Sequence, residues 1–265
     1  MSLDDLNRQI SAPLGEWAGD LDYVPSRGQH LSSSGLCIVG TNQDESLVCK
    51  MYIDANAHVY GNNFSARAVR EIRMMLLAGS DSAVRLHGRL FQGGEIMGFF
   101  TPYEKPLDYA SVSSETKRRM ISEMEALVRR VHESGLIHGD IKPDNVLIRR
   151  SDGKLVLCDW AGAQFEKDAV MPLEGTTGYQ SAWRFKNYER PLCREDDLYA
   201  LGVSIWQIWV NKDPFNPNEH EDLEDDIMNG LRPDLNQVDD EEVRRLIKTY
   251  LDISPPHRDA KPGDL

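Results

Sequence analysis

The stretch His138-Gly-Asp-Ile-Lys-Pro-Asp-Asn145 decides the fold of this chain. Asp and Asn are common in loops, so this stretch alone would be a weak signal. A second stretch, Leu155-Val-Leu-Cys-Asp-Trp-Ala-Gly162, follows it and places Asp159 nineteen positions after Asp140. A turn at Ser151-Asp-Gly153 lies between them, flanked by apolar strands, and two motifs at this spacing argue against a chance match.

Together the two stretches resemble the catalytic loop and the metal-binding motif of protein kinases, H-R-D-x-K-x-x-N followed by D-F-G. Phosphoryl transfer needs magnesium, which prefers oxygen ligands, and an acceptor hydroxyl in line with the γ-phosphate. The resemblance implies that Asp140 is the catalytic base and that Lys142 neutralises charge at the γ-phosphate. It implies that Asn145 and Asp159 hold magnesium.

The resemblance continues on both sides of these stretches. Lys50 in Leu47-Val-Cys-Lys50 resembles the strand lysine that contacts the α- and β-phosphates of ATP, and Glu71 resembles the helical acid that pairs with it. Further matches lie at Gly175-Thr-Thr-Gly-Tyr179, Asp197-Leu-Tyr-Ala-Leu-Gly202 and His257-Arg-Asp259, so the likeness runs from about residue 35 to 262. It implies that Asp197 braces the backbone of the catalytic loop.

Two positions indicate the acceptor. Lys142 lies two residues after Asp140, which is the serine/threonine type of pattern in this family. Thr176 stands where such kinases place a threonine between the catalytic aspartate and lysine. We therefore expect a protein substrate that carries a Ser or Thr acceptor, with ATP and Mg²⁺ as cofactors.

Several positions depart from the family pattern. Ser32-Ser-Ser-Gly35 replaces the glycine-rich loop, and we assign Ser33, Ser34 and Gly35 to nucleotide binding. Gly139 replaces the arginine that usually receives an activation-loop phosphate, which predicts a kinase independent of that switch. Trp160-Ala161 replaces Phe-Gly, and Trp160 is expected to pack in the core.

The A-P-E segment is also absent, since Ser181-Ala-Trp183 occupies its place. The acid that would pair with Arg258 is therefore missing, and Glu189 is one substitute.

The nucleotide pocket has further expected lining residues. Thr101 precedes Pro102-Tyr103, which would fall in the hinge, so Thr101 is the expected gatekeeper, with Phe100 as the alternative, and Tyr103 is assigned to the nucleotide site. Cys158 would lie at the pocket floor, where we expect an unreactive buried thiol.

The expected fold class is α+β. The resemblance implies a bilobal protein-kinase-like fold, with a small β-rich N-lobe of about residues 31–103, a larger α-helical C-lobe of about 104–265, and ATP in the cleft. Residues 1–30 are polar and read as an irregular arm or cap with some packing through Trp17 and Tyr23. The patterns predict strands in 35–39, 46–52 and 84–102, and helices over 64–77, 115–134, 205–210 and 239–251.

The amino-acid composition restricts the classes of molecule that we expect as binding partners. With 43 acidic against 30 basic residues, the formal charge is −13, which argues against nucleic acid and anionic membranes and mildly favours basic partners. The four cysteines show no CxxC or zinc spacing. The polar first residues lead us to expect no signal peptide, and the absence of a long apolar run leads us to expect no membrane span. We expect reduced thiols and an intracellular location, cytoplasmic or nuclear. No coiled-coil heptads occur, and the oligomeric state stays open.

Three functions compete. The first is an active Ser/Thr protein kinase. The second is a pseudokinase scaffold, which the poor glycine loop and missing A-P-E favour and the retained Lys50, Glu71, Asp140, Asn145 and Asp159 oppose. The third is a small-molecule phosphotransferase of the aminoglycoside or choline kinase type, whose H-G-D and D-W patterns also occur here. Lys142 and the segment 175–179 oppose the third.

Overall fold

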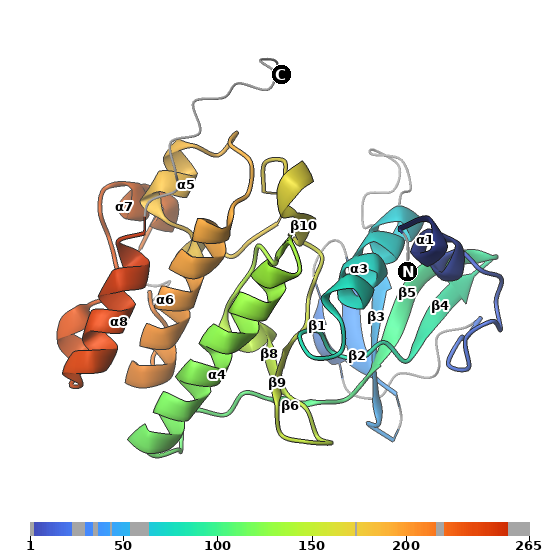
Figure 1. Ribbon diagram of the computed structural model, residues 1–265, viewed down its shortest axis with the longest axis horizontal. Coiled ribbons are helices and arrows are strands. Elements are labelled where there is room, and N and C mark those ends of the chain that lie inside the picture. Colours follow the sequence, from blue (N-terminus) through green and yellow to red (C-terminus); the bar gives the residue numbers. More distant parts are fainter. Residues whose placement is uncertain are drawn as a thin grey trace. The chain divides into compact units, whose positions relative to one another are not determined.

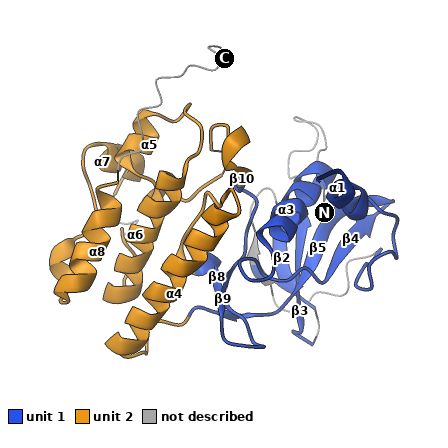
Figure 2. Cartoon of the chain, in the orientation of Figure 1, with its two compact units in different colours: residues 1–107, 144–163 blue, residues 108–143, 164–265 orange. Residues whose placement is uncertain are grey.

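A computed structural model describes residues 3–22, 30–33, 37–42, 44–53, 64–172, 174–215 and 220–253. The chain forms two compact units, one of residues 1–107 and 144–163 (unit 1) and one of residues 108–143 and 164–265 (unit 2), shown in Figure 2. The predicted lobes stay a prediction, and these units differ from them in that residues 144–163 group with the N-terminal part.

Unit 1 is built on a five-stranded antiparallel sheet with strand order β1-β2-β3-β5-β4. A second, three-stranded sheet has the order β6-β8-β9. The elements of unit 1 are α1 (Leu3–Ile10), β1 (His30–Ser33), β2 (Cys37–Thr41), β3 (Leu47–Tyr52), α3 (Phe64–Ala78), β4 (Gly88–Gln92), β5 (Glu95–Pro102), β6 (Lys105–Pro106), β8 (Val146–Ile148) and β9 (Leu155–Leu157).

Helix α3 packs on strands β3 and β5 of the larger sheet, and α1 packs on α3 (Figure 1). The buried side chains of α3 include Ala68, Ile72 and Met75, which recur at helical spacing as predicted for 64–77. The segment between α3 and β4 contacts the smaller sheet, because Val84 N donates to the carbonyl of Leu157 on β9 at 2.9 Å and Leu157 N donates to the carbonyl of Ser82 at 2.8 Å. These bonds connect the 144–163 segment to the rest of unit 1.

The N-terminal segment is ordered by a buried ion pair, not irregular as the sequence suggested. Helix α1 buries Leu6 and Ile10, which lie one turn apart. Arg89 on β4 donates to Asp20 Oδ1 at 3.0 Å and to the carbonyl of Ile10 at 2.6 Å. Its guanidinium lies over the ring of Trp17. The predicted packing through Trp17 is present, and Tyr23 lies outside the described residues.

Unit 2 is mainly helical. Its elements are α4 (Ser114–Glu133), β7 (Leu136–Ile137), β10 (Gln164–Phe165), η2 (Glu166–Asp168), η3 (Thr177–Tyr179), α5 (Ala182–Lys186), α6 (Arg194–Val210), α7 (Leu223–Met228), η4 (Leu235–Gln237) and α8 (Glu241–Leu251), and the short helix η1 (Pro143–Asn145) crosses from unit 2 into unit 1. The predicted helices over 115–134, 205–210 and 239–251 correspond to α4, α6 and α8.

Helix α6 is the centre of unit 2, because it packs against both α4 and α8 (Figure 1). It is apolar on all sides over most of its length, which is typical of a helix surrounded by protein. Helix α4 instead has one apolar face, with Ile121, Met124, Leu127 and Val131 buried. The short strands β7 and β10 pair antiparallel and frame the segment that leads to Asp140.

Candidate active site

In unit 1, Lys50 and Glu71 form a buried ion pair between strand β3 and helix α3. Lys50 Nζ lies 2.9 Å from Glu71, whose side chain is 1% exposed. Glu71 also accepts hydrogen bonds from the hydroxyl of Tyr52 and from the backbone N–H of Trp160, the latter at 2.9 Å. A buried carboxylate requires such partners, so Glu71 is held in one place. The predicted pairing of Lys50 with Glu71 is present.

Lys50 also reaches Asp159, with Nζ 2.6 Å from Oδ1. Burial alone would lower the pKa of Lys50, but the carboxylates of Glu71 and Asp159 outweigh it and raise that pKa well above its usual range. Lys50 is therefore a permanent cation at neutral pH. A fixed cation is what the resemblance implies at this position, and its contact with phosphates stays a prediction.

Asp159 lies directly after β9 with a φ of 57°, a left-handed conformation that is uncommon for a residue with a side chain. Its side chain is 43% exposed, whereas that of Glu71 is 1% exposed, so of these two carboxylates Asp159 is the one that can meet a ligand. Asn145 is adjacent in the same hairpin, because the N–H of Cys158 donates to its carbonyl at 2.9 Å. Burial and the charge of Asp159 raise the pKa of the Cys158 thiol to about 12, as expected of an unreactive thiol.

These donors fit a magnesium ion. Magnesium usually keeps several waters and takes only one or two protein oxygens beside those of a phosphate. Asp159 and Asn145 offer a carboxylate and an amide oxygen, both in unit 1. Within the described ranges, no cluster of three or more His, Cys, Asp or Glu side chains could form a metal site by itself. The residues therefore suit an ion shared with a phosphate chain.

Arg70 fastens the segment after Asp159 to helix α3, a role that sequence reasoning missed. Its guanidinium donates to the carbonyls of Ala161 at 2.5 Å and Ala163 at 2.6 Å. Trp160 is fully buried, as predicted, and its indole N–H donates to the carbonyl of Leu157 at 3.1 Å. The helix that positions Glu71 thus also holds the backbone beyond Asp159, where the usual glycine is absent.

In unit 2, three side chains form a closed set of hydrogen bonds. Thr176 Oγ1 donates to Asp140 Oδ1 at 2.8 Å and accepts from Lys142 Nζ at 2.7 Å. Lys142 Nζ also donates to Asp140 Oδ2 at 2.8 Å. The arrangement ties the segment around Thr176 to the loop of Asp140 and orients the carboxylate. Sequence reasoning placed Thr176 between the other two.

Asp197 in the first turn of α6 holds the backbone of this loop. It accepts from the N–H groups of His138 at 2.9 Å and Gly139 at 2.8 Å, and from Nε2 of His132 at 2.9 Å. Burial would raise the pKa of Asp197, but the hydrogen bond and charge of His132 together with the backbone donors lower it. The predicted brace is present, and it remains a carboxylate at neutral pH.

Comparison with known proteins agrees with this geometry. A family model of the protein kinase domain matches residues 33–260. This chain belongs to the protein kinase family. It is 28% identical over 147 residues to the serine/threonine-protein kinase ppk34 of Schizosaccharomyces pombe, covering 54% of this chain and 41% of that protein. It is 31% identical over 115 residues to the serine/threonine-protein kinase KSP1 of Saccharomyces cerevisiae, covering 40% of this chain and 11% of that protein.

The matched regions span less than half the length of these two curated relatives. Among solved structures, the kinase PK-1 of Cydia pomonella granulovirus superposes with a TM-score of 0.62 at 17% identity, covering 85% of this chain and 86% of that one. The likeness confirms the predicted protein-kinase-like α+β fold. In the described part of the chain, no helix is both long and apolar enough to cross a membrane.

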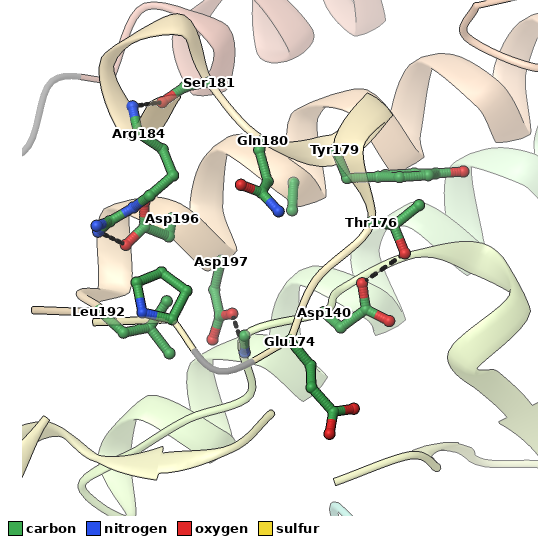
Figure 3. A pocket seen from close by; sticks show the side chains of 13 residues that line it. Asp140, Glu174, Thr176, Tyr179, Gln180, Ser181, Arg184, Leu192, Asp196 and Asp197 are labelled. Atoms are coloured by element: carbon green, nitrogen blue, oxygen red, sulfur yellow. Dashed lines mark hydrogen bonds and ion pairs between the residues drawn. The ribbon is translucent and has the colours of Figure 1, made fainter. Parts of the chain in front are cut away.

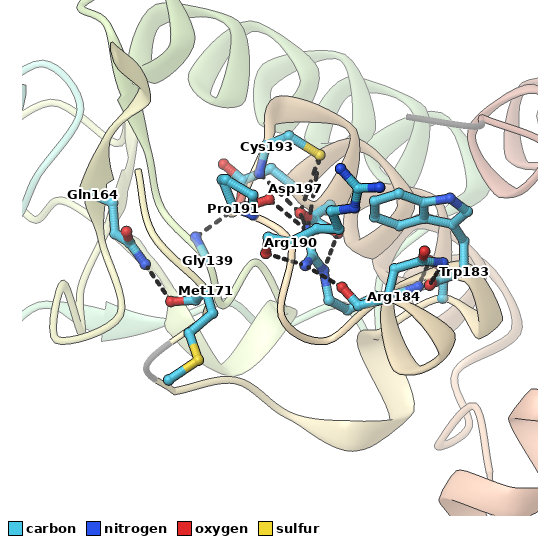
Figure 4. A network of polar contacts seen from close by, with 12 residues as sticks. Gly139, Gln164, Met171, Trp183, Arg184, Arg190, Pro191, Cys193 and Asp197 are labelled. Carbon is cyan, nitrogen blue, oxygen red and sulfur yellow. Dashed lines mark hydrogen bonds and ion pairs between the residues drawn. The ribbon is translucent and has the colours of Figure 1, made fainter. Parts of the chain in front are cut away.

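An ion pair between Arg184 on α5 and Asp196 on α6 lies next to the segment that stands in the place of A-P-E (Figure 3). Arg184 is 1% exposed, and its Nε donates to Asp196 Oδ1 at 2.9 Å. It also donates to the carbonyls of Arg190 at 2.8 Å and Pro191 at 3.0 Å, as Figure 4 shows. Arg184 thus connects the end of the activation segment to the helix that carries Asp197. Sequence reasoning missed it, although a lone Arg inside an apolar-flanked short helix was a signal.

The remaining predicted positions are placed as follows. Glu189 is exposed, and Arg258 lies outside the described residues, so their pairing stays a prediction. Ser33 ends β1 opposite Ile38, whereas Ser34 and Gly35 also lie outside the described residues.

The strand register separates the two gatekeeper candidates. In the β3–β5 ladder Val48 lies opposite Thr101 and Cys49 opposite Phe100. Paired residues share a face and successive residues alternate, so Thr101 is on the face of Lys50 and Phe100 on the other. This favours Thr101. Tyr103 begins the connector after β5, and its N–H donates to the carbonyl of Ser46 at 2.9 Å.

Proposed function

We propose that this kinase domain transfers the γ-phosphate of ATP, in the presence of magnesium, to a serine or threonine hydroxyl of a protein substrate. The observation that carries the proposal is the hydrogen-bonded set of Asp140, Thr176 and Lys142, with Thr176 Oγ1 2.8 Å from one carboxylate oxygen of Asp140. These bonds hold the carboxylate of Asp140 in one orientation beside the cation of Lys142, which supports its role as the group that accepts a proton. The retained Lys50–Glu71 pair supports an active kinase over a scaffold.

The residues of unit 2 would act on the acceptor. Asp140 accepts a hydrogen bond from the substrate hydroxyl and takes its proton as the oxygen–phosphorus bond forms. The bond between the γ-phosphorus and the bridging oxygen of ADP breaks, and ADP leaves with that electron pair. Lys142, which lies 2.8 Å from Asp140, offsets the negative charge of the transferred group.

The residues of unit 1 would hold the nucleotide. Lys50 offers a fixed positive charge to the phosphates, and Glu71 keeps it in place. A magnesium ion bound by Asp159 and Asn145 would supply charge neutralisation at the phosphate oxygens. Thr101 and Tyr103 are proposed to line the nucleotide site, with Ser33, Ser34 and Gly35 of the glycine-poor loop.

The test is transfer of radiolabelled phosphate from ATP to generic basic and casein-like proteins, with the wild type and Asp140→Asn side by side. We expect labelling of serine and threonine that falls at least about a hundredfold in the variant, the range for loss of a general base. Acid hydrolysis of the labelled protein would identify the phosphorylated amino acids.

Each of the remaining outcomes would contradict a different part of the proposed function. Equal labelling by wild type and Asp140→Asn would remove the assigned base. Labelling confined to tyrosine would overturn the acceptor assignment. The absence of labelling, together with the absence of an ATP-dependent thermal shift, would favour a scaffold. An intact thermal shift without protein labelling would favour a small-molecule acceptor.

A further inference from the structure

The segment of residues 3–22 precedes the part of the chain that matches the protein kinase family model, which begins at residue 33. It is nevertheless packed into unit 1. Of the described helices and strands, α3 is the one on which α1 mainly packs, and the two helices lie side by side in Figure 1. Leu6 and Ile10 of α1 are 2% and 0% exposed, so burial of their apolar side chains stabilises this packing.

Arg89 on β4 fixes the chain directly after α1. Its guanidinium donates to the carbonyls of Ile10 at 2.6 Å, Ala12 at 2.7 Å and Pro13 at 3.1 Å. Its Nε donates to Asp20 Oδ1 at 3.0 Å. Hydrogen bonds from a cation are stronger than those between neutral groups, and a cation at the C-terminal end of a helix is favourable. The end of α1 is therefore held to strand β4.

The backbone of the segment is also held to β4. Leu21 lies beside Leu90 in a parallel bridge, and the N–H of Leu21 donates to the carbonyl of Arg89 at 3.0 Å. Gly19 and Gly88 approach so closely that a Cβ on Gly88 would lie 2.0 Å from the carbonyl oxygen of Gly19. The segment thus has one position, with β4 holding one end and α3 covered by the other.

Helix α3 carries two side chains that reach the nucleotide-side residues of unit 1. Glu71 lies 2.9 Å from Lys50 Nζ, and Arg70 donates to the carbonyl of Ala161 at 2.5 Å. Both side chains move with the helix, so a shift of α3 disturbs both contacts at once. A misplacement of about 1 Å in a catalytic group can cost about a hundredfold in rate.

We propose that the segment 3–22 positions α3 for phosphoryl transfer: Leu6 and Ile10, anchored through Arg89, hold this helix where Glu71 meets Lys50. These three residues are positioning residues, because they act through Glu71 and not on the nucleotide. The role rests on the proposed function in one respect, since Lys50 is there the cation that holds the phosphates of ATP. It assigns a part in the reaction to a segment outside the family match.

The test compares one substitution at three leucines. Leu6→Ala weakens the packing of α1 on α3. Leu3→Ala is the control within α1, where the side chain is 47% exposed, and Leu251→Ala is the control for lost stability, at a leucine 3% exposed at the end of α8 in unit 2. Ile10→Val is the milder variant that replaces Leu6→Ala if that protein does not fold.

Two quantities are measured at a temperature at which circular dichroism shows every variant folded. The first is acylation of Lys50 by an amine-reactive ester without nucleotide, quantified by mass spectrometry against Lys248, whose side chain is 64% exposed. The second is kcat for phosphate transfer from ATP. Glu71→Gln supplies the acylation rate of Lys50 without the charge of its partner.

Burial lowers the pKa of Lys50 and the charge of Glu71 raises it, so displacement of Glu71 leaves Lys50 more reactive. Acylation should rise at least about threefold in Leu6→Ala, because each unit of lowered pKa multiplies the neutral amine about tenfold. The kcat should fall by about tenfold, within the range for a misplaced catalytic group. Both controls should keep the acylation rate and kcat of the wild type.

Unchanged acylation of Lys50 in Leu6→Ala would overturn the inference, whatever happens to kcat. Equal changes in Leu6→Ala and Leu251→Ala would overturn it as well, because general loss of stability would then be the cause. Raised acylation in Leu6→Ala alone, with no phosphate transfer by any of the proteins, would overturn the proposed function and support the hold of this segment on the Lys50–Glu71 pair.

Discussion

Replacement of Arg184 by methionine tests whether the Arg184–Asp196 pair holds the activation segment to helix α6. Methionine keeps much of the volume of arginine but removes all its donors. The variant removes the hydrogen bonds that Arg184 donates to Asp196 Oδ1 at 2.9 Å and to the carbonyls of Arg190 at 2.8 Å and Pro191 at 3.0 Å. The side chains of the pair are only 2% and 12% exposed, so water compensates little.

Breaking a buried ion pair by removing one partner costs about 3–5 kcal/mol. Asp196 keeps hydrogen bonds from the backbone N–H of Cys193 at 2.9 Å and from its thiol at 3.2 Å, which points to the lower end, about 3 kcal/mol. The melting temperature should then fall by about 6–12 °C, at about 2–4 °C for each kcal/mol. Because Asp197 follows Asp196, kcat should fall as well.

The assay is urea unfolding followed by circular dichroism, for Arg184→Met, Asp196→Asn and the double variant. A coupling energy above about 1 kcal/mol is expected in this cycle. The control is Arg118→Met, which breaks a pair with Asp240 whose arginine is 40% exposed, and should cost less than about 1 kcal/mol. A cost for Arg184→Met no larger than that of the control, or an additive cycle, would refute the reasoning.

Three further predictions concern other parts of the domain. Asp159→Asn should abolish phosphoryl transfer with little change in thermal unfolding, because this side chain is 43% exposed; undiminished transfer would remove the metal assignment. In the folded state the pKa of Asp197 lies below its ordinary value of 3.8, so the stability that its carboxylate contributes is present above about pH 4 and is lost as the pH falls through the folded-state pKa. Urea unfolding between pH 5 and pH 3 should show this loss of stability, and Asp197→Asn should not show it. Arg89→Met should cost about 3–5 kcal/mol and expose the N-terminal segment to limited proteolysis, because the side chains of Arg89 and its partner Asp20 are both 0% exposed; unchanged resistance to protease would contradict this.

Much of the secondary structure could be predicted from local sequence patterns. The helix over 64–77 and the strands on either side of Gln92-Gly93-Gly94 follow from spacing within a few residues, and α3, β4 and β5 lie there. The candidate site was predictable because its motifs have fixed spacings: Lys50 meets Glu71, and Thr176 meets Asp140 and Lys142.

Contacts between distant segments were not predictable in this way. The pair of Arg89 and Asp20 joins residues 69 positions apart that belong to no motif. Without that pair the glycines and prolines before residue 30 read as an irregular arm, although Leu6 and Ile10 carry a weak helical period. Local sequence shows a possible helix there, but only the tertiary contact stabilises so short a one.

The departures from the family pattern are physically connected within unit 2. Gly139 has a positive φ and its N–H donates to Asp197, and Asp197 follows the acid that pairs with Arg184. The loop is thus held by the carboxylate of Asp197, which is charged without any phosphate. An arginine at position 139 would need a phosphate on the activation segment as its partner, whereas this set is complete from residues of the chain itself. The structure therefore gives a physical reason for the prediction that activity does not depend on phosphorylation of that segment, and phosphatase treatment should leave the rate of transfer unchanged.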